Sequence, residues 1–173
     1  MKDSALSIAN YFVQKSLDGN RDLKPLKLMK LVYIAHGYML ALFDKSVFNK
    51  RFDTVEAWKF GPVVPSVYHS FKSYANTVIT EKTGGFVNVE MENGQEVAEY
   101  YEPILQDENA KRVCNVVWNI YSKYTDNTLV TLLHAVGTPW SAVYEEGKNN
   151  IIPDELTKKY YQKIIKSLIK SDK

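Results

Sequence analysis

The chain has few of the features that mark a secreted, membrane-bound or metal-binding protein. It contains a single cysteine, Cys114, which excludes an internal disulfide and a cysteine zinc cluster and fits a reducing compartment. Cys114 also falls on an apolar helical stripe and is expected in the core. Residues 1–4 lack the apolar core of a signal peptide, and no later run is expected to span a bilayer. We therefore expect a cytoplasmic protein without a membrane partner.

A strong excess of positive charge is also missing. Lysine and arginine number 22 and aspartate and glutamate number 20 in 173 residues, a length that predicts one domain over residues 1–173. A dedicated nucleic-acid binder carries a stronger basic footprint, so nucleic acid is disfavoured as a partner without being excluded.

Motifs for catalysis are missing as well. The three histidines, His36, His69 and His134, are far apart in sequence and match no metal-binding spacing. We expect His36 to make a buried hydrogen bond, His69 to lie on a polar helix face, and His134 to act as a cation near a helix C-terminus. No nucleophile elbow, phosphate loop or dinucleotide fingerprint is present. These patterns predict no enzyme, and no catalytic, cofactor-binding or metal-binding residues.

What the sequence does contain is mostly helical periodicity. The segment 28–38 is apolar nearly all round, which predicts a central buried helix over Pro25 to Phe43. Its predicted core residues are Leu28, Leu31, Val32, Ala35 and Met39. Further helices are expected from Ala5 to about Asp18, from Pro65, after an Asp107 cap, after an Asp126 or Thr128 cap through His134, from Thr138-Pro139 to Gly147, and from about Pro153.

Strand signals occupy the middle of the chain. The run from Phe52 to Phe60 reads as a strand ended by Gly61-Pro62, and residues 86–91 and 97–101 flank an Asn-Gly turn. We expect these regions to form one small antiparallel sheet. The predicted fold class is mainly α with a small antiparallel β-hairpin or sheet, an α+β helical domain around a central buried helix.

Two groups of residues are candidates for partner binding. The first is the set of apolar residues crowded around the Gly-Pro turn: Trp58, Phe60, Pro62, Val63 and Tyr68. They either anchor an interface or cover the central helix.

The second group is acidic, because residues 81–108 carry eight acidic side chains against Lys82 alone. The candidates in this group are Glu90, Glu92 and Glu96, which either face a basic partner or keep a hairpin solvated.

Three segments together resemble the Panacea domain, the SocA-like family of bacterial and phage antitoxins. They are Leu28-Met29-Lys30-Leu31-Val32-Tyr33-Ile34-Ala35, Gly61-Pro62-Val63-Val64-Pro65-Ser66-Val67-Tyr68, and Thr131-Leu132-Leu133-His134 with Thr138-Pro139-Trp140. The resemblance implies an antitoxin that neutralises a cognate protein toxin by contact. It also implies an alternative, a proteolytic adaptor that delivers a protein to an unfoldase-protease. The acidic segment from Thr77 to Ile104 matches no motif of the family.

Two further readings stay open. The last helix places Tyr161, Ile164, Ile165 and Leu168 on one side and Lys159, Lys163, Lys166 and Lys170 largely on the other. This lysine face suits the phosphates of a nucleic acid, which would make the chain a nucleic-acid-binding regulator, but it offers no element to read bases. A hydrolase would require the three histidines to converge in the fold.

Overall fold

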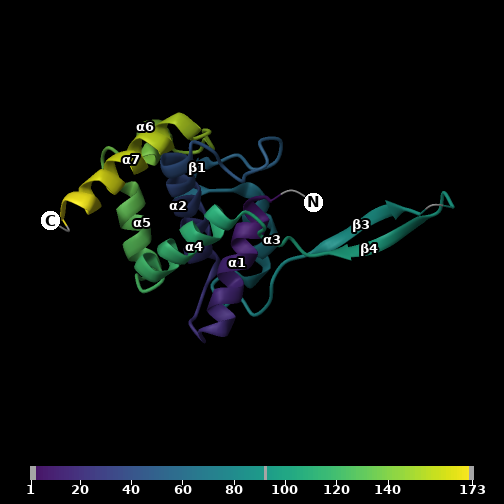
Figure 1. The fold of residues 1–173 in the computed structure, drawn as a ribbon. Helices are drawn as coiled ribbons and strands as arrows, with labels where there is room; N and C mark the ends of the chain where they lie inside the picture. The colour runs from purple at the N-terminus through teal and green to yellow at the C-terminus, as the bar shows by residue number, and fades with distance from the viewer. Residues whose placement is uncertain (1–2, 92, 172–173) are drawn as a thin grey trace.

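Helices predominate in the computed structural model, which describes residues 3–91 and 93–171 (Figure 1). The helices are α1 (Ala5–Asp18), α2 (Pro25–Phe43), α3 (Pro65–Phe71), the short 3-10 helix η1 (Lys72–Tyr74), α4 (Glu108–Tyr121), α5 (Asp126–His134), α6 (Pro139–Val143) and α7 (Asp154–Ser171). The strands are β1 (Glu56–Trp58), β2 (Gly61–Val63), β3 (Gly85–Glu90) and β4 (Glu96–Tyr101). The predicted fold class, mainly α with a small antiparallel β component, is confirmed.

Helix α2 is the centre of the structure. It contacts α1, α3, α4, α5 and α7 as well as β2. The five predicted core residues of this helix are each at most 1% exposed, which confirms the predicted core. The helix begins at Pro25 as a first-turn proline and is capped at its C-terminal end by Asp44, whose φ of 54° is left-handed. Gly37 lets α7 approach closely, because a Cβ at Gly37 would clash with the ring of Tyr161.

The expectation that no segment is long and apolar enough to cross a bilayer was wrong for α2. Its 19 residues meet that criterion by length and composition. The structure gives the physical reason for this composition, since α2 is surrounded by other helices and most of its residues are buried. A core helix enclosed on all sides needs apolar residues all round.

Capping residues set most helix ends near the predicted positions. Asp107 caps α4 by accepting a hydrogen bond from the amide of Ala110, as predicted. The cap of α5 is Thr125, not Asp126 or Thr128, because the Thr125 side chain accepts from the amide of Thr128. Thr138 caps α6 as predicted, but α6 ends at Val143, well before Gly147.

The strands form two separate two-stranded sheets, which corrects the prediction of one sheet. β1 pairs with β2, and β3 pairs with β4. Gly61 was predicted to end the first strand, but it is the first residue of β2. Its φ of 102° lets the chain reverse over two residues, so that Trp58 lies opposite Gly61. The other edge of β1 pairs with the segment before α7, through Ala57 N to Asn150 O at 2.8 Å. Only three residues of the predicted strand over Phe52 to Phe60 are in β1.

The β3–β4 hairpin projects away from the helices as a free-standing ribbon (Figure 1). Its Asn-Gly turn and its two strands were predicted, and Gly94 has the left-handed φ of 76° that such a turn requires. The side chains described over 85–100 are all exposed, and Tyr101 at the base is half-buried. The hairpin therefore contributes almost nothing to the core.

Candidate functional site

Segments from three parts of the chain meet at the turn between β1 and β2. Lys30 from the second turn of α2 is fully buried, and its Nζ donates a hydrogen bond to the carbonyl oxygen of Pro62 at 3.0 Å. A Cβ placed on Gly61 would lie 2.9 Å from Lys30 Nζ and 3.3 Å from His134 Nε2. The absence of a side chain at Gly61 therefore lets both nitrogen atoms approach the turn.

His134 and Trp140 complete this cluster from α5 and α6. Their rings stack with centroids 3.9 Å apart and an interplanar angle of 6°. Trp140 Nε1 donates to the carbonyl oxygen of Trp58 at 2.8 Å. His134 Nε2 is buried against the turn, close to Gly61. We call Lys30, Gly61, Pro62, His134 and Trp140 the turn cluster.

Burial controls the charge of the turn cluster. It lowers the pKa of Lys30 to about 7, because the ammonium is removed from water. The pKa of His134 is also lowered, first by burial and then by the charge of Lys30. The prediction that His134 acts as a cation at the end of α5 was therefore wrong, although its position at the helix end was right. The cluster holds the turn on the helices and points inward.

The other two histidines lie elsewhere. His36 is buried as predicted, with Nδ1 2.7 Å from Ser46 Oγ and Nε2 3.0 Å from Asp154 Oδ1. The hydrogen bond with His36 is the main cause that lowers the pKa of Asp154. His69 is exposed on α3, as predicted, and its ring contacts Tyr68. Each histidine therefore contacts a different set of residues. Among the described residues, no three His, Cys, Asp or Glu side chains are placed to hold a metal ion.

The apolar candidates around the turn divide into buried and exposed members. Pro62 and Val63 are buried, so they support the turn from within. Phe60 at the tip of the turn is 60% exposed. Trp58 and Tyr68 are half-buried, and their rings pack edge to face with centroids 4.8 Å apart. We call Trp58, Phe60 and Tyr68 the turn surface. It is the part of this group that is accessible from solvent.

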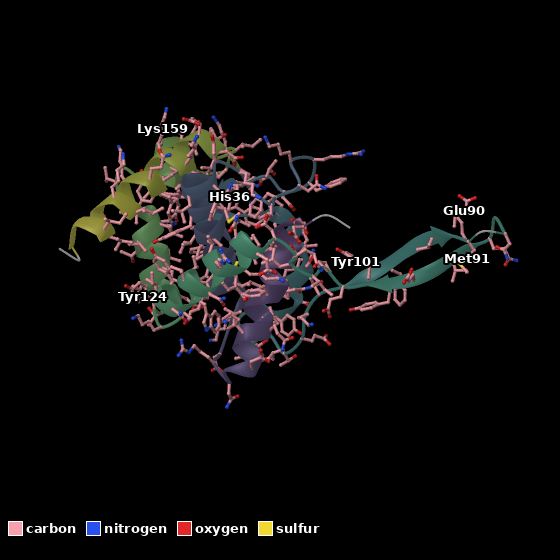
Figure 2. All side chains as sticks on the ribbon, in the orientation of Figure 1. His36, Glu90, Met91, Tyr101, Tyr124 and Lys159 are labelled. Atoms are coloured by element: carbon pink, nitrogen blue, oxygen red, sulfur yellow. The ribbon has the colours of Figure 1, made fainter. Side chains whose placement is uncertain are left out.

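The acidic candidates lie on the hairpin. Glu90 and Glu96 are exposed and face each other in the register of β3 and β4, and Glu92 lies outside the described residues. In Figure 2, Glu90 and Met91 lie near the outer end of the hairpin and Tyr101 lies where it joins the helices. The turn surface and the acidic candidates therefore belong to different structural regions.

Sequence reasoning missed two features of these regions. The first is Lys30, and the available signal was the one charged residue within the apolar segment 28–38. The second is a set of apolar hairpin side chains that stand in water, with exposed fractions between 36% and 75%. They are Phe86, Val89, Met91, Val97 and Tyr100. The partial alternation in residues 86–91 predicted the strand, but it did not show that these apolar side chains stay uncovered by the described part of the chain.

Comparison with known proteins supplies the family. The family described as "Antitoxin SocA-like, Panacea domain" matches residues 28–141, which include the whole turn cluster and the hairpin. A curated relative, Antitoxin SocA of Caulobacter vibrioides, is 28% identical over 146 residues, covering 80% of this chain and 69% of the relative. No solved structure matches the chain.

Proposed function

The chain belongs to the antitoxin SocA-like, Panacea-domain family, and we propose that it neutralises a cognate protein toxin by direct contact. The setting would be the cytoplasm, in a bacterial or prophage toxin–antitoxin system. The family match carries this proposal, because it covers residues 28–141 and is joined by a relative named as an antitoxin. The contact itself is assigned to the turn surface and to the hairpin.

The turn surface supports a role in binding. Phe60 projects from a turn that is fixed from behind, because Lys30 bonds the carbonyl of Pro62 and Trp140 bonds the carbonyl of Trp58. A rigid, exposed aromatic ring loses little conformational entropy on binding, so it is an effective interface anchor. We infer that the turn cluster positions the turn surface and takes no part in chemistry.

The placement of the histidine rings also fits a protein that acts by direct contact better than it fits an enzyme. Both ring nitrogens of His36 are engaged, and His134 is stacked under Trp140 with Nε2 turned to the interior. A general base must reach a proton of its substrate. We therefore propose a protein that is not an enzyme and acts stoichiometrically.

Delivery to an unfoldase-protease and regulation through nucleic acid are the alternatives. On α7, the lysines proposed for phosphate contact include Lys159, which lies 3.4 Å from Glu155. This pairing weakens the lysine face as a phosphate-binding surface. No described residue favours either alternative over direct neutralisation.

The test uses the protein encoded by the reading frame next to this gene. We expect that frame alone to stop growth and co-expression of this chain to restore it. The two purified proteins should form a complex, and Phe60→Ala should shorten its lifetime by about tenfold, the effect of losing one interface anchor. Phe52→Ala is the matched control, since Phe52 is 61% exposed and is not one of the three residues of the turn surface.

Two results would contradict the proposal. One is a neighbouring protein that is harmless or does not bind. The other is rescue that requires the host's unfoldase-protease and disappears in a strain without it, which would establish delivery in place of direct neutralisation. A gel shift with the operator DNA tests the nucleic-acid reading.

A further inference from the structure

The free-standing hairpin is the feature of the structure that the fold does not use. We propose that β3 and β4 insert, tip first, into a cationic cleft of the toxin that binds phosphate groups of the toxin's own substrate. This inference rests on the proposed antitoxin function and names the class of toxin and the mode of inhibition.

The register divides the hairpin into two different faces. One face carries Phe86 and Tyr100, whose ring centroids lie 5.6 Å apart in an edge-to-face arrangement. The same face carries Glu90 and Glu96 about 13 Å closer to the tip. The other face carries Val89 opposite Val97. Because both faces expose apolar side chains, a partner that covered only one of them would leave the other in water.

Exposed apolar surface on a two-stranded ribbon calls for a covering partner. An isolated hairpin is marginally stable in water, and contiguous apolar patches on soluble proteins mark interaction sites. The described side chains of this hairpin have no helix or sheet behind them (Figure 2). A cleft is the shape that covers both faces of a narrow ribbon at once.

The charge of the hairpin identifies the kind of cleft. Residues 85–101 contain four glutamates, at 90, 92, 96 and 99, and no lysine or arginine. A second copy of the chain would bring more carboxylates to the same place, so like-charge repulsion disfavours self-association through the hairpin. A cationic partner matches the charge.

The order of the groups along the hairpin resembles that of a nucleotide substrate. Carboxylates near the tip take the place of phosphates, and the exposed rings of Phe86 and Tyr100 offer stacking faces as bases do. Proteins that bind phosphates line their sites with lysine and arginine, which also pair with carboxylates. The hairpin would thus compete directly with the toxin's substrate.

The experiment measures association of the purified toxin, encoded beside this gene, with variants of the full chain. Glu90→Lys/Glu96→Lys should lower the association rate at least about tenfold at low salt, and the difference should shrink as ionic strength screens the charges. The matched control is Asp22→Lys/Glu146→Lys, which makes the same change in net charge on exposed residues of the helical region. This control should change the rate less than about twofold.

A second pair of variants tests the apolar faces. Val89→Thr/Val97→Thr should raise the dissociation rate about tenfold, whereas Val136→Thr, at a fully exposed valine outside the hairpin, should not. Poly(A) RNA serves as the phosphate-bearing probe and should displace the wild-type protein from the toxin.

The outcomes separate this inference from the proposed function. If the wild-type protein binds the toxin and both hairpin variants bind equally well, or poly(A) RNA fails to compete, the insertion is overturned while the antitoxin function stands. If the wild-type protein does not bind the toxin at all, the proposed function fails and the insertion fails with it. Unchanged circular dichroism of the variants verifies that they are folded.

Discussion

The helical region and the hairpin follow opposite rules of burial. In α2, residues such as Leu31 and Val32 are completely buried and contact neighbours on all sides, whereas in the hairpin Phe86 is 75% exposed. Apolar side chains stabilise the helical region by leaving water, and the same types of side chain gain nothing in the free hairpin. The helices therefore hold the fold together, whereas the apolar residues of the hairpin do not, which is why we propose that they serve a contact made outside this chain.

The two regions also differ in charge. The helical region mixes charges of both signs in ion pairs such as Lys45 with Asp107 at 2.8 Å and Lys158 with Asp44 at 2.7 Å. The hairpin carries glutamate alone. Mixed charges suit a surface that stays in water, while charge of one sign steers a partner of the opposite sign.

The largest effect should come from placing a charge in the core. Leu31→Asp or Val32→Asp should remove more than about 4 kcal/mol from the free energy of unfolding, because an unpaired carboxylate would be buried in a close-packed interior. Val89→Asp on the hairpin should change the free energy of unfolding by less than about 0.5 kcal/mol. Thermal unfolding followed by circular dichroism measures both. A cooperative transition near the wild-type temperature in both core variants would rule this core out.

The next effect concerns Lys30 and its dependence on pH. Its pKa in the folded protein, about 7, lies below its ordinary value of 10.5, so folding disfavours the protonated form. Above the ordinary pKa, Lys30 is neutral in both states and does not reduce the free energy of unfolding. As the pH falls toward the pKa of the folded protein, the unfolded chain binds the proton first and the free energy of unfolding decreases. Relative to Lys30→Met, the wild-type free energy of unfolding should rise by about 2 kcal/mol as pH is raised from about 7.5 to about 9.5.

The measurement for Lys30 is chemical denaturation at several pH values below about 9.5. At higher pH the buried tyrosines interfere, because burial raises the pKa of Tyr33, Tyr121 and Tyr161 and their stabilising contribution is lost as pH rises further. Lys158→Met is the control, since Lys158 pairs with Asp44 and its pKa is raised, not lowered. Equal pH profiles for wild type and Lys30→Met would show that the buried ammonium is not a source of pH dependence.

Histidine variants should show smaller effects, confined to stability. His36→Gln should cost about 1–3 kcal/mol because two hydrogen bonds are lost in a buried place. His134→Gln should cost about 1 kcal/mol through the lost stacking on Trp140, and His69→Gln should cost almost nothing. Growth rescue should persist in each folded variant. A folded His134→Gln protein that binds the toxin but no longer protects cells would point to catalysis.

Removing the whole hairpin should also have only a small effect on stability. Replacing residues 85–101 by a glycine-serine linker of about four residues should shift the midpoint of thermal unfolding by only a few degrees, because no core residue is lost. Toxin binding should nevertheless be strongly weakened. Cooperative unfolding that disappears with the hairpin would show that the helical region depends on it.

The predictable parts of the fold are those with local signals. Apolar periodicity identified α2, the Asn-Gly pair identified the hairpin turn, and Asp107 was identified as a cap from its side chain alone. Each of these signals is contained within a short stretch of the sequence. The helical region is largely encoded in this way.

The parts that escaped prediction depend on distant partners. β1 and β2 have three residues each, too few for a period to show, and the other edge of β1 pairs with the segment near Asn150. The meeting of Lys30 with Gly61 and His134 requires the tertiary structure. A solvated hairpin was one reading of the acidic segment, but the exposure of its apolar side chains depends on whether another element covers them, which no local signal shows.

The central claim is that the chain neutralises its toxin by stoichiometric contact. The most direct test is a titration of the purified toxin's activity with the purified chain, without ATP or protease. We expect activity to fall linearly and to end near a molar ratio of about one to one, as tight binding requires. Complete inhibition at a small fraction of that ratio, or inhibition that appears only when ATP and an unfoldase-protease are added, would contradict the account.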